Sequence, residues 1–332
     1  MCQKNKQEGG ENVMKKRTLL AVALLSLVAF VGTAYAVTYI TIASGGIGGT
    51  YYPLGGVMAE ILTKAGIDVK ATSRATSASR ENCRLVASGR AHIGMSMGST
   101  LYQAYTGTEA FEEDGALPLR ILMHMYPAPH HIVTTKGTGI TKFEDIIGKK
   151  VSVGAPGGGD QVLTNMILEA AGIDPDKDIK KQQLTQPEGV MALKDGNVDV
   201  VFWNFATPGS AVLEVAAVRD IVMIPIPQDV VDRVVEKFPF MFPYKIPKGT
   251  YPGQEEDVLT VADGNFLAVN KDMDEELAYK LVKTIIENRE EIMQSIPQAE
   301  HFVPEEASIA IIPVHPGAAK YFKEHGIEVP VE

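Results

Sequence analysis

Residues 38–56 read TYITIASGGIGGTYYPLGG, and this stretch decides the expected fold. Its first six residues are rich in threonine, isoleucine and tyrosine, which favour a β-strand. The glycine-rich residues 44–50 predict a loop, and the largely apolar stretch 51–65 predicts a helix that ends at Gly66. A strand, a glycine-rich loop and a helix in this order are typical of a parallel sheet covered by helices.

The same pattern continues and then begins again further along the chain. Residues 68–97 predict a strand, a helix and a third strand, so that 38–97 has the β-α-β-α-β order of an α/β domain. A second strand, glycine loop and helix follow over 150–171, and 198–203 predicts a buried strand. Two such units predict two lobes with a ligand cleft, because open α/β sheets bind ligands at the carboxyl ends of their strands.

The predicted lobes are not continuous in sequence. We expect two segments to cross between them, near 130–135 and near 261–269. Lobe one then consists of 37–129 together with 263–332, and lobe two consists of 130–262.

The N-terminal residues 1–36 have the features of a cleaved secretory signal. Basic residues at 15–17 precede an apolar run at 18–31, and residues 34–36 read Ala-Tyr-Ala, a small-x-small cleavage site. The apolar run is shorter than the roughly 20 residues that a membrane span needs. We therefore expect a periplasmic protein, and an N-terminal membrane anchor is the alternative.

Charge and cysteine content narrow the function further. The formal net charge is −10 at pH 7, and removal of a basic leader makes the remaining chain more acidic still. Such a charge argues against a nucleic-acid partner. One of the two cysteines, Cys2, lies in the leader, so Cys83 has no partner for an internal disulfide and reads as a small buried hydrophobe.

The first glycine loop is the leading candidate for a ligand site. Glycines allow close approach of the backbone, and the free N–H groups at the start of the next helix attract a carboxylate or phosphate. No Lys-Ser/Thr pair closes the loop, which excludes a P-loop, and we expect no cofactor. The candidate ligand-binding residues here are Ser44, Gly45, Gly46, Thr50, Tyr51 and Tyr52.

Polar residues after the next two strands extend this site. Those candidates are Thr76, Ser79, Arg80, Asn82, Ser96 and Ser99. Helix capping is the simpler role for the hydroxyl groups at 76–79. Residues 94–98 also fit the Gly-x-Ser-x-Gly motif of serine hydrolases. Ser96 reads as part of the strand itself rather than of a sharp turn, so we expect no catalytic residue.

The second lobe supplies the remaining candidates. The glycine loop contributes Gly157 and Gly158, and Asp160 stands where a helix N-cap is expected, where its carboxylate repels an anion or attracts an ammonium group. Trp203 and Phe205 end a strand and are expected to form an apolar wall. His131 lies near a crossing and is a candidate donor, and no histidine, cysteine or carboxylate spacing indicates a metal site.

Five motifs resemble those of the TAXI family, the solute receptors of one branch of the TRAP transporters. They are GGTYYPLGG at 48–56, SREN at 79–82, LVASGRAHIG at 85–94, GKKVSVGAPG at 148–157 and IPKGTYPGQ at 246–254. The resemblance implies a type II periplasmic-binding-protein fold and delivery of the ligand to a TRAP membrane permease driven by an ion gradient. It implies glutamate, glutamine, 2-oxoglutarate or a similar organic acid as ligand.

The chain departs from this family in the fourth motif. Relatives often read Gly-Ala-Pro-Gly-Ser-Gly-Thr, where this chain has Gly158 and Asp160 in place of the serine and threonine. An added carboxylate favours an amino acid or monocarboxylate over a dicarboxylate. The alternatives to a transport receptor are a secreted enzyme, on the same bilobed fold or as a serine hydrolase, and a periplasmic sensor subunit.

Overall fold

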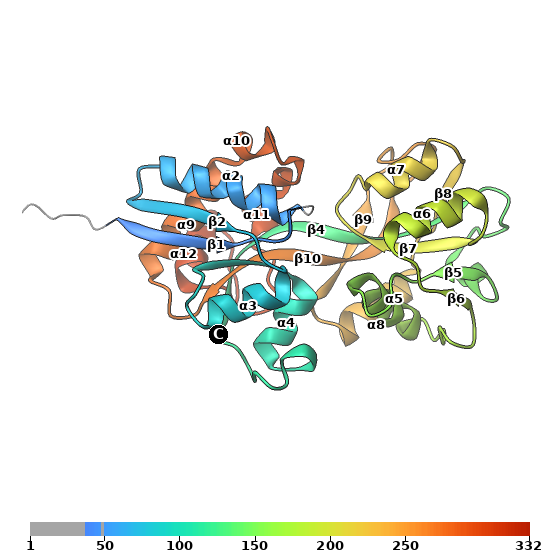
Figure 1. Cartoon of the computed structure of the whole chain (residues 1–332), viewed down its shortest axis with the longest axis horizontal. Helices are drawn as coiled ribbons and strands as arrows, with labels where there is room; N and C mark the ends of the chain where they lie inside the picture. Colours follow the sequence, from blue (N-terminus) through green and yellow to red (C-terminus); the bar gives the residue numbers. More distant parts are fainter. Residues whose placement is uncertain (1–36, 48–49) are drawn as a thin grey trace, which may run out of the picture. The chain divides into compact units, whose positions relative to one another are not determined.

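The computed structural model describes residues 37–47 and 50–332, almost all of which belong to one compact unit, Tyr39–Glu332. The predicted signal peptide at 1–36 lies outside the described residues. The described chain begins with β1 (Thr38–Ala43), continues with α2 (Tyr51–Lys64) and returns through β2 (Val69–Arg74). Figure 1 shows these elements at the start of the colour series.

The next elements complete the first half of the sheet. They are α3 (Ser79–Ala87), β3 (Ile93–Met97) and α4 (Gly98–Thr106). Strands β1 and β3 pair in parallel, with Ile42 opposite Ile93. This confirms the β-α-β-α-β order that the sequence predicts. The buried faces of α2 and α3 pack on the strands in a core that includes Leu54, Met58 and Leu85.

Two long strands, β4 (Leu119–Thr135) and β10 (Val258–Asn270), run through both halves of the sheet (Figure 1). Sequence patterns predict two separate strands over 120–126 and 132–135, and this is wrong, because β4 is one strand of 17 residues. Pro127 and Pro129 interrupt the sequence pattern but not the strand. They are tolerated because β7 joins β4 only from His130 onward, which leaves one edge of β4 free at the prolines.

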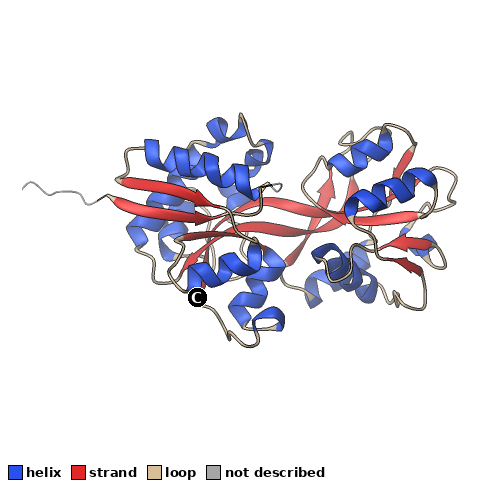
Figure 2. Cartoon of the chain, viewed as in Figure 1, coloured by secondary structure: helices blue, strands red, loops and turns tan. Residues whose placement is uncertain are grey.

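The second half of the sheet is built on β4 and β10. Strand β7 pairs with β4 and with β5, which in turn pairs with β6, while β8 and β9 add to β4 and β10. Helices cover both faces of this half, as Figure 2 shows. The elements are β5 (Lys150–Ser152), α5 (Gly159–Ala170), β6 (Lys180–Gln182), α6 (Gln186–Asp195), β7 (Val200–Asn204), α7 (Ser210–Ala216), β8 (Ile221–Met223), α8 (Gln228–Lys237) and β9 (Met241–Ile246).

The C-terminal part returns to the first half. A single amphipathic helix is predicted over 274–293, but α9 (Glu275–Glu287) ends where Asn288 leaves the helical region at φ −101°, and α10 (Arg289–Met293) follows. The short α11 (Pro304–Ala307) and α12 (Pro316–Glu324) come last. The His315 amide donates to the carbonyl of Ile121 at 2.9 Å, which ties this segment to β4. Short 3₁₀ turns occupy Glu109–Phe111, Phe143–Ile146 and Pro297–His301.

Candidate functional site

A pocket of about 430 Å³ lies where the two halves of the sheet meet. It draws on the loops after β1, β2 and β7, on the end of β3, and on the shared strands β4 and β10. Its walls are thus formed from both predicted lobes. The lining residues are Gly45, Gly46, Thr50, Tyr51, Ala78, Ser79, Met97, Tyr126, Ala128, Asn204, Phe205, Ala206 and Asn265.

The start of α2 forms one wall of the pocket. Thr50 is the N-cap residue, and within the described residues its side chain makes no capping hydrogen bond, so the first backbone N–H groups of α2 have no intrahelical or side-chain cap there. Gly45 allows the close approach of Tyr51, whose Cβ lies 3.0 Å from where a Cβ of residue 45 would stand. The neighbouring Tyr52 is exposed and does not line the pocket, because adjacent residues on a helix point in different directions.

Tyr51 connects this wall to the strands β10 and β4, which form the floor of the pocket. Its hydroxyl donates to Asn265 Oδ1 at 2.5 Å, and Asn265 donates through Nδ2 to the carbonyl of Tyr126 at 3.3 Å. Burial raises the pKa of Tyr51 well above its ordinary value, so the phenol stays protonated. The pocket is therefore lined here by uncharged hydrogen-bonding groups from α2, β4 and β10.

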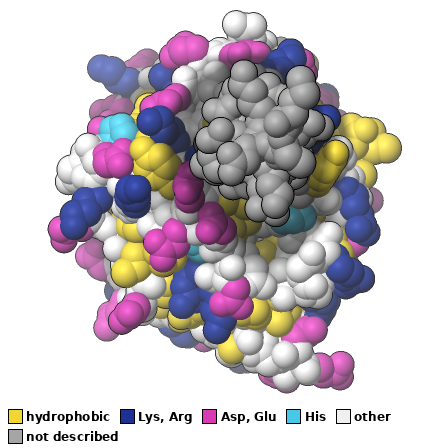
Figure 3. Space-filling view, turned by 90° about the vertical axis from the view of Figure 1, so that its left-hand side faces the viewer, with side chains coloured by type: hydrophobic (Ala, Val, Ile, Leu, Met, Phe, Trp, Pro, Cys, Tyr) yellow, Lys and Arg dark blue, Asp and Glu magenta, His cyan; other side chains and the backbone are white. Residues whose placement is uncertain are grey.

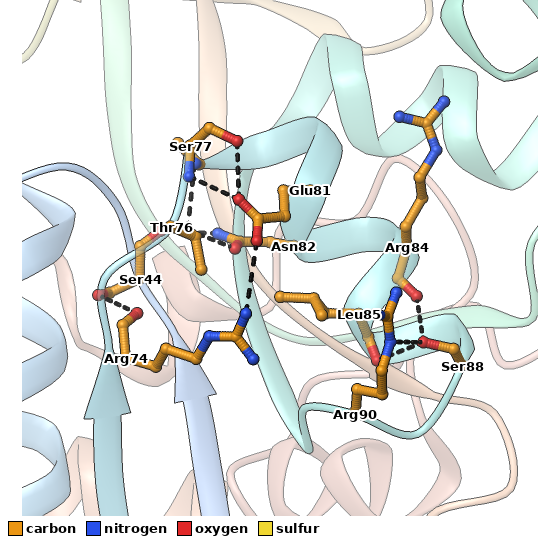
Figure 4. A network of polar contacts seen from close by, with 11 residues as sticks. Ser44, Arg74, Thr76, Ser77, Glu81, Asn82, Arg84, Leu85, Ser88 and Arg90 are labelled. Atoms are coloured by element: carbon orange, nitrogen blue, oxygen red, sulfur yellow. Dashed lines mark hydrogen bonds and ion pairs between the residues drawn. The ribbon is translucent and has the colours of Figure 1, made fainter.

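Several predicted ligand residues bind the protein's own backbone instead. Asn82 donates through Nδ2 to the carbonyls of Ser44 and Met95, at 2.6 and 2.7 Å, and accepts from the Thr76 hydroxyl at 2.7 Å. Figure 4 shows Thr76 and Asn82 turned toward each other beside Ser44. This corner holds the ends of β1, β2 and β3 together, and Ser44, Thr76 and Asn82 do not line the pocket.

Ser79 and Arg80 differ in position although they are adjacent. Ser79 lines the pocket, and its Oγ accepts a hydrogen bond from the Met97 amide at 3.1 Å. Arg80 is exposed and does not line it. The nearby Arg74 points to Glu81, with 3.6 Å between Nη2 and Oε1 (Figure 4). These arginines therefore lie on the surface of the first half.

Ser96 and Ser99 have internal partners. Ser96 is buried within β3 and donates to the carbonyl of Met97 at 3.0 Å, so it does not stand on the exposed turn that a hydrolase nucleophile requires. Ser99 donates to the buried Asp263 through its amide at 3.2 Å and through its hydroxyl at 2.8 Å. Asp263 thus caps α4 from the crossing strand β10, and burial raises its pKa to about 7.

The second glycine loop differs from the sequence prediction. Gly158, not Asp160, is the N-cap residue of α5, so the predicted cap at Asp160 is wrong. The N-cap lies two residues earlier than predicted, and Asp160 is the second residue of α5. Burial raises the pKa of Asp160 to about 6. Gly157 donates its amide to Gln161 Oε1 at 2.7 Å, and neither Gly157 nor Gly158 lines the pocket.

Aromatic residues form the wall contributed by the second half. Phe205 lines the pocket, whereas Trp203 is buried behind it with ring centroids 6.0 Å apart. His131 packs on Phe205 at 4.5 Å, and its Nε2 lies 2.7 Å from the Tyr251 hydroxyl. His131 and Trp203 therefore support Phe205 from the core and do not themselves line the pocket.

The sequence prediction missed the lining residues that belong to the strands themselves. These are Met97, Tyr126, Ala128, Asn204 and Asn265, together with the loop residues Ala78 and Ala206. A usable signal existed for two of them, because Asn204 ends the otherwise apolar strand β7 and Asn265 is an amide within the largely buried strand β10. A buried amide in such a strand needs a polar partner.

Three further features concern the described chain as a whole. Within residues 37–47 and 50–332, no group of three histidine, cysteine or acidic side chains is placed to hold a metal ion. No helix of this part has the length and apolarity to cross a membrane. Acidic and basic side chains are intermixed on the face in Figure 3.

Comparison with known proteins agrees with this architecture. Residues 42–326 match the model of the NMT1-like family. A putative sulfonate ABC transporter protein, the periplasmic sulfonate-binding SsuA from Methylobacillus flagellatus KT, is 19% identical, with a TM-score of 0.50 over 83% of this chain and 75% of that chain. The fold is thus the α/β, two-lobed fold of periplasmic binding proteins.

Two further solved structures are similar at lower scores. The periplasmic aliphatic sulphonate binding protein SsuA from Escherichia coli is 15% identical, with a TM-score of 0.48 over 86% of this chain and 78% of that chain. Substrate binding domain 2 of Lactococcus lactis GlnP, in an open conformation, is 12% identical, with a TM-score of 0.45 over 82% of this chain and 96% of that chain.

Proposed function

Because the chain belongs to the NMT1-like family and carries a pocket lined from both halves of its sheet, we propose that it is an extracytoplasmic solute-binding receptor of a transporter. The observation that carries the proposal is the pocket itself. Its volume of about 430 Å³ is in the range that small-molecule sites occupy. Its lining combines hydroxyl groups, two carboxamides and aromatic rings.

The ligand we propose is a small organic acid or amino acid, such as glutamate, glutamine or 2-oxoglutarate. Its carboxylate binds at the start of α2, beside Gly45, Gly46 and Thr50, where free backbone N–H groups and the helix dipole favour a negative charge. Ser79 adds a hydroxyl on the same side. The remainder of the ligand packs on Phe205.

The transporter we propose is of the TRAP type, with the TAXI family as its receptors. The support is the set of five sequence motifs, and Thr50 and Tyr51 of the first motif and Ser79 of the second line the pocket. The partner is then a membrane permease driven by an ion gradient. The Methylobacillus protein is named for an ABC transporter, but at 19% identity it supports the fold alone.

Binding without catalysis and a periplasmic location complete the proposal. The Gly-x-Ser-x-Gly segment supports no hydrolase, because Ser96 is buried and hydrogen-bonded inside the first lobe. The signal at 1–36 supports export. We propose that lobe one consists of 37–129 with 263–332 and that lobe two consists of 130–262. The change of strand partner along β4 supports this boundary, because β4 pairs with β10 up to Pro129 and with β7 from His130.

Ligand binding is expected to stabilise the protein without turnover. A ligand present at about 1,000 times its Kd adds roughly 4 kcal/mol to the free energy of unfolding. We expect a few compounds in a panel of organic acids and amino acids to raise the melting temperature, and chromatography to recover them unchanged. Chemical conversion of a stabilising compound contradicts the receptor proposal. The proposal is also contradicted if no compound of the panel binds and native mass spectrometry finds no retained ligand.

Loss of the aromatic wall is expected to weaken that binding. Replacing Phe205 with alanine removes a ring that lines the pocket, and we expect about a tenfold higher Kd, which corresponds to roughly 1.4 kcal/mol. The control is Leu213→Ala, since Leu213 is exposed on α7 and does not line the pocket. Calorimetry with the compound that stabilises most compares the two, and equal Kd values place the ligand elsewhere.

A further inference from the structure

The side chains that line the pocket are all uncharged. No lysine, arginine, histidine, aspartate or glutamate is among the lining residues in the described part of the chain. Residues 48 and 49 of the adjoining loop lie outside that part, and both are glycine, which carries no charge. A charged group of a ligand therefore finds only dipoles here as partners, and a buried charge without a partner is costly.

The dipoles that favour a negative charge lie on the first half of the sheet. Helices α2 and α3 begin at Tyr51 and Ser79, which both line the pocket, and within the described residues no side chain caps either start. The start of α4 follows Met97, which also lines the pocket, but there the Asp263 carboxylate already accepts from the Ser99 amide. One acid group of a ligand is thus served by α2 and α3.

The wall from the second half of the sheet offers no partner for a further charge. It consists of Asn204, Phe205 and Ala206, at the end of β7 and in the loop after it. The Asn204 side chain donates through Nδ2 to the carbonyl of Ala128 at 2.5 Å, and its Oδ1 is buried away from the pocket. An ammonium group needs acceptors, and the one amide oxygen of this wall is turned away from it.

The acceptors of the pocket floor already have donors. Asn265 Oδ1 accepts from the Tyr51 hydroxyl at 2.5 Å. The carbonyl of Tyr126 accepts from Asn265 at 3.3 Å, and that of Ala128 accepts from Asn204. An ammonium group in the pocket would have to compete with these internal hydrogen bonds, so its loss of hydration is poorly compensated.

The rest of the lining suits an uncharged, apolar group. Its apolar side chains are Ala78, Met97, Ala128, Phe205 and Ala206. Burial of hydrocarbon against such side chains is favourable, and small-molecule sites are usually lined in this way. The pocket thus combines one end that attracts an anion with an interior that favours a neutral body.

We propose that the pocket selects a monocarboxylic acid with an uncharged, largely apolar body, and rejects the same carbon skeleton when it carries an ammonium group or a second carboxylate. The acid group lies at the starts of α2 and α3, and the body packs on Met97 and Phe205. This inference rests on the proposed receptor function and narrows its ligand from organic acids and amino acids to monocarboxylates, such as 2-oxo acids with an apolar side chain.

The first test keeps the carbon skeleton and changes its charge. 2-Oxopentanoate, norvaline and 2-oxoglutarate share five carbons, and phenylpyruvate and phenylalanine form a second pair with a larger apolar body. Calorimetry on the exported chain, free of its leader, measures all five. We expect each 2-oxo monocarboxylate to bind at least tenfold more tightly than its amino acid, and 2-oxopentanoate to bind at least tenfold more tightly than 2-oxoglutarate.

A charge placed in the pocket is expected to reverse this selectivity. Ala206→Asp adds a carboxylate to the lining, and Ala206→Asn adds the same volume without charge. The added volume is expected to weaken binding in both variants. Because the new carboxylate attracts an ammonium group and repels an acid, we expect the preference for 2-oxopentanoate over norvaline to be at least tenfold smaller in Ala206→Asp than in Ala206→Asn.

The outcomes separate this selectivity from the receptor function. Binding of norvaline or 2-oxoglutarate as tightly as 2-oxopentanoate, or more tightly, overturns the selectivity and leaves the receptor function intact. The same preference in Ala206→Asp and Ala206→Asn overturns the placement of the ligand body. Should Ala206→Asp fail to fold, the comparison of ligands on the wild type still decides. Binding of none of the five compounds overturns the inference, and the receptor proposal then depends on the wider panel.

Discussion

The Asp263→Ala variant is expected to unfold with a free energy about 3 kcal/mol lower than that of the wild type. Asp263 lies on the crossing strand β10 and is fully buried, and it accepts from both the amide and the hydroxyl of Ser99. Alanine leaves these donors at the start of α4 unsatisfied inside the protein. The exposed Asp272→Ala is the control, and its unfolding free energy is expected to change by less than about 0.5 kcal/mol.

The same residue is expected to give stability a distinct dependence on pH. Burial raises the pKa of Asp263 to about 7, above the roughly 3.9 of an unfolded chain. The folded state therefore binds the proton more tightly, so the stabilising contribution is fully present below about pH 4 and is lost as the pH rises through 7. Between pH 5 and pH 8, the free energy of unfolding of the wild type is expected to fall by about 2 to 3 kcal/mol relative to that of Asp263→Asn.

Urea unfolding of the wild type and Asp263→Asn at several pH values measures this difference. The comparison with the variant is needed because His124, His130 and His131 act in the opposite sense. Burial lowers the pKa of each of these histidines to about 3, so their contribution is lost as the pH falls below about 6.5. Parallel pH profiles for wild type and Asp263→Asn contradict a raised pKa at Asp263.

The sequence predicted the local elements of the fold because those elements depend on short patterns. The glycine loop after β1 requires close backbone approach, and the structure places Gly45, Gly46, Thr50 and Tyr51 at the pocket. The long strand β4 was not predicted as one element, since prolines normally end strands. Whether Pro127 and Pro129 are tolerated depends on which strands lie beside them, and that is a property of the sheet.

The site was harder to predict because polar residues near strand ends have two competing uses. Ser44, Thr76 and Asn82 follow strands in the way that ligand residues do, yet they satisfy backbone carbonyls and one another. Ser79 stands in the same stretch and reaches the pocket. Sequence alone does not separate these cases, because the distinction depends on the direction of each side chain after three strands have come together.

The adjacent glycines Gly55 and Gly56 in α2 offer a matched pair of substitutions with opposite expected results. A Cβ at residue 55 would stand 2.6 Å from Ser73 Oγ and 2.9 Å from Ser44 Cβ, so α2 has to move away from β1 and β2. Overpacking of this kind costs about 1–3 kcal/mol. A Cβ at residue 56 meets nothing within 4 Å, and replacing glycine with alanine there is expected to stabilise the helix by about 1 kcal/mol.

We therefore expect Gly55→Ala to lower the free energy of unfolding and Gly56→Ala to raise it, with about 2 kcal/mol between the two variants. Because α2 begins at the pocket, displacement of the helix by Gly55→Ala is also expected to weaken ligand binding, whereas Gly56→Ala leaves it unchanged. Denaturant unfolding and calorimetry on the two proteins test both expectations. Equal stabilities would show that α2 is not seated against Ser44 and Ser73, and the wall that we assign to the ligand carboxylate would then lose its support.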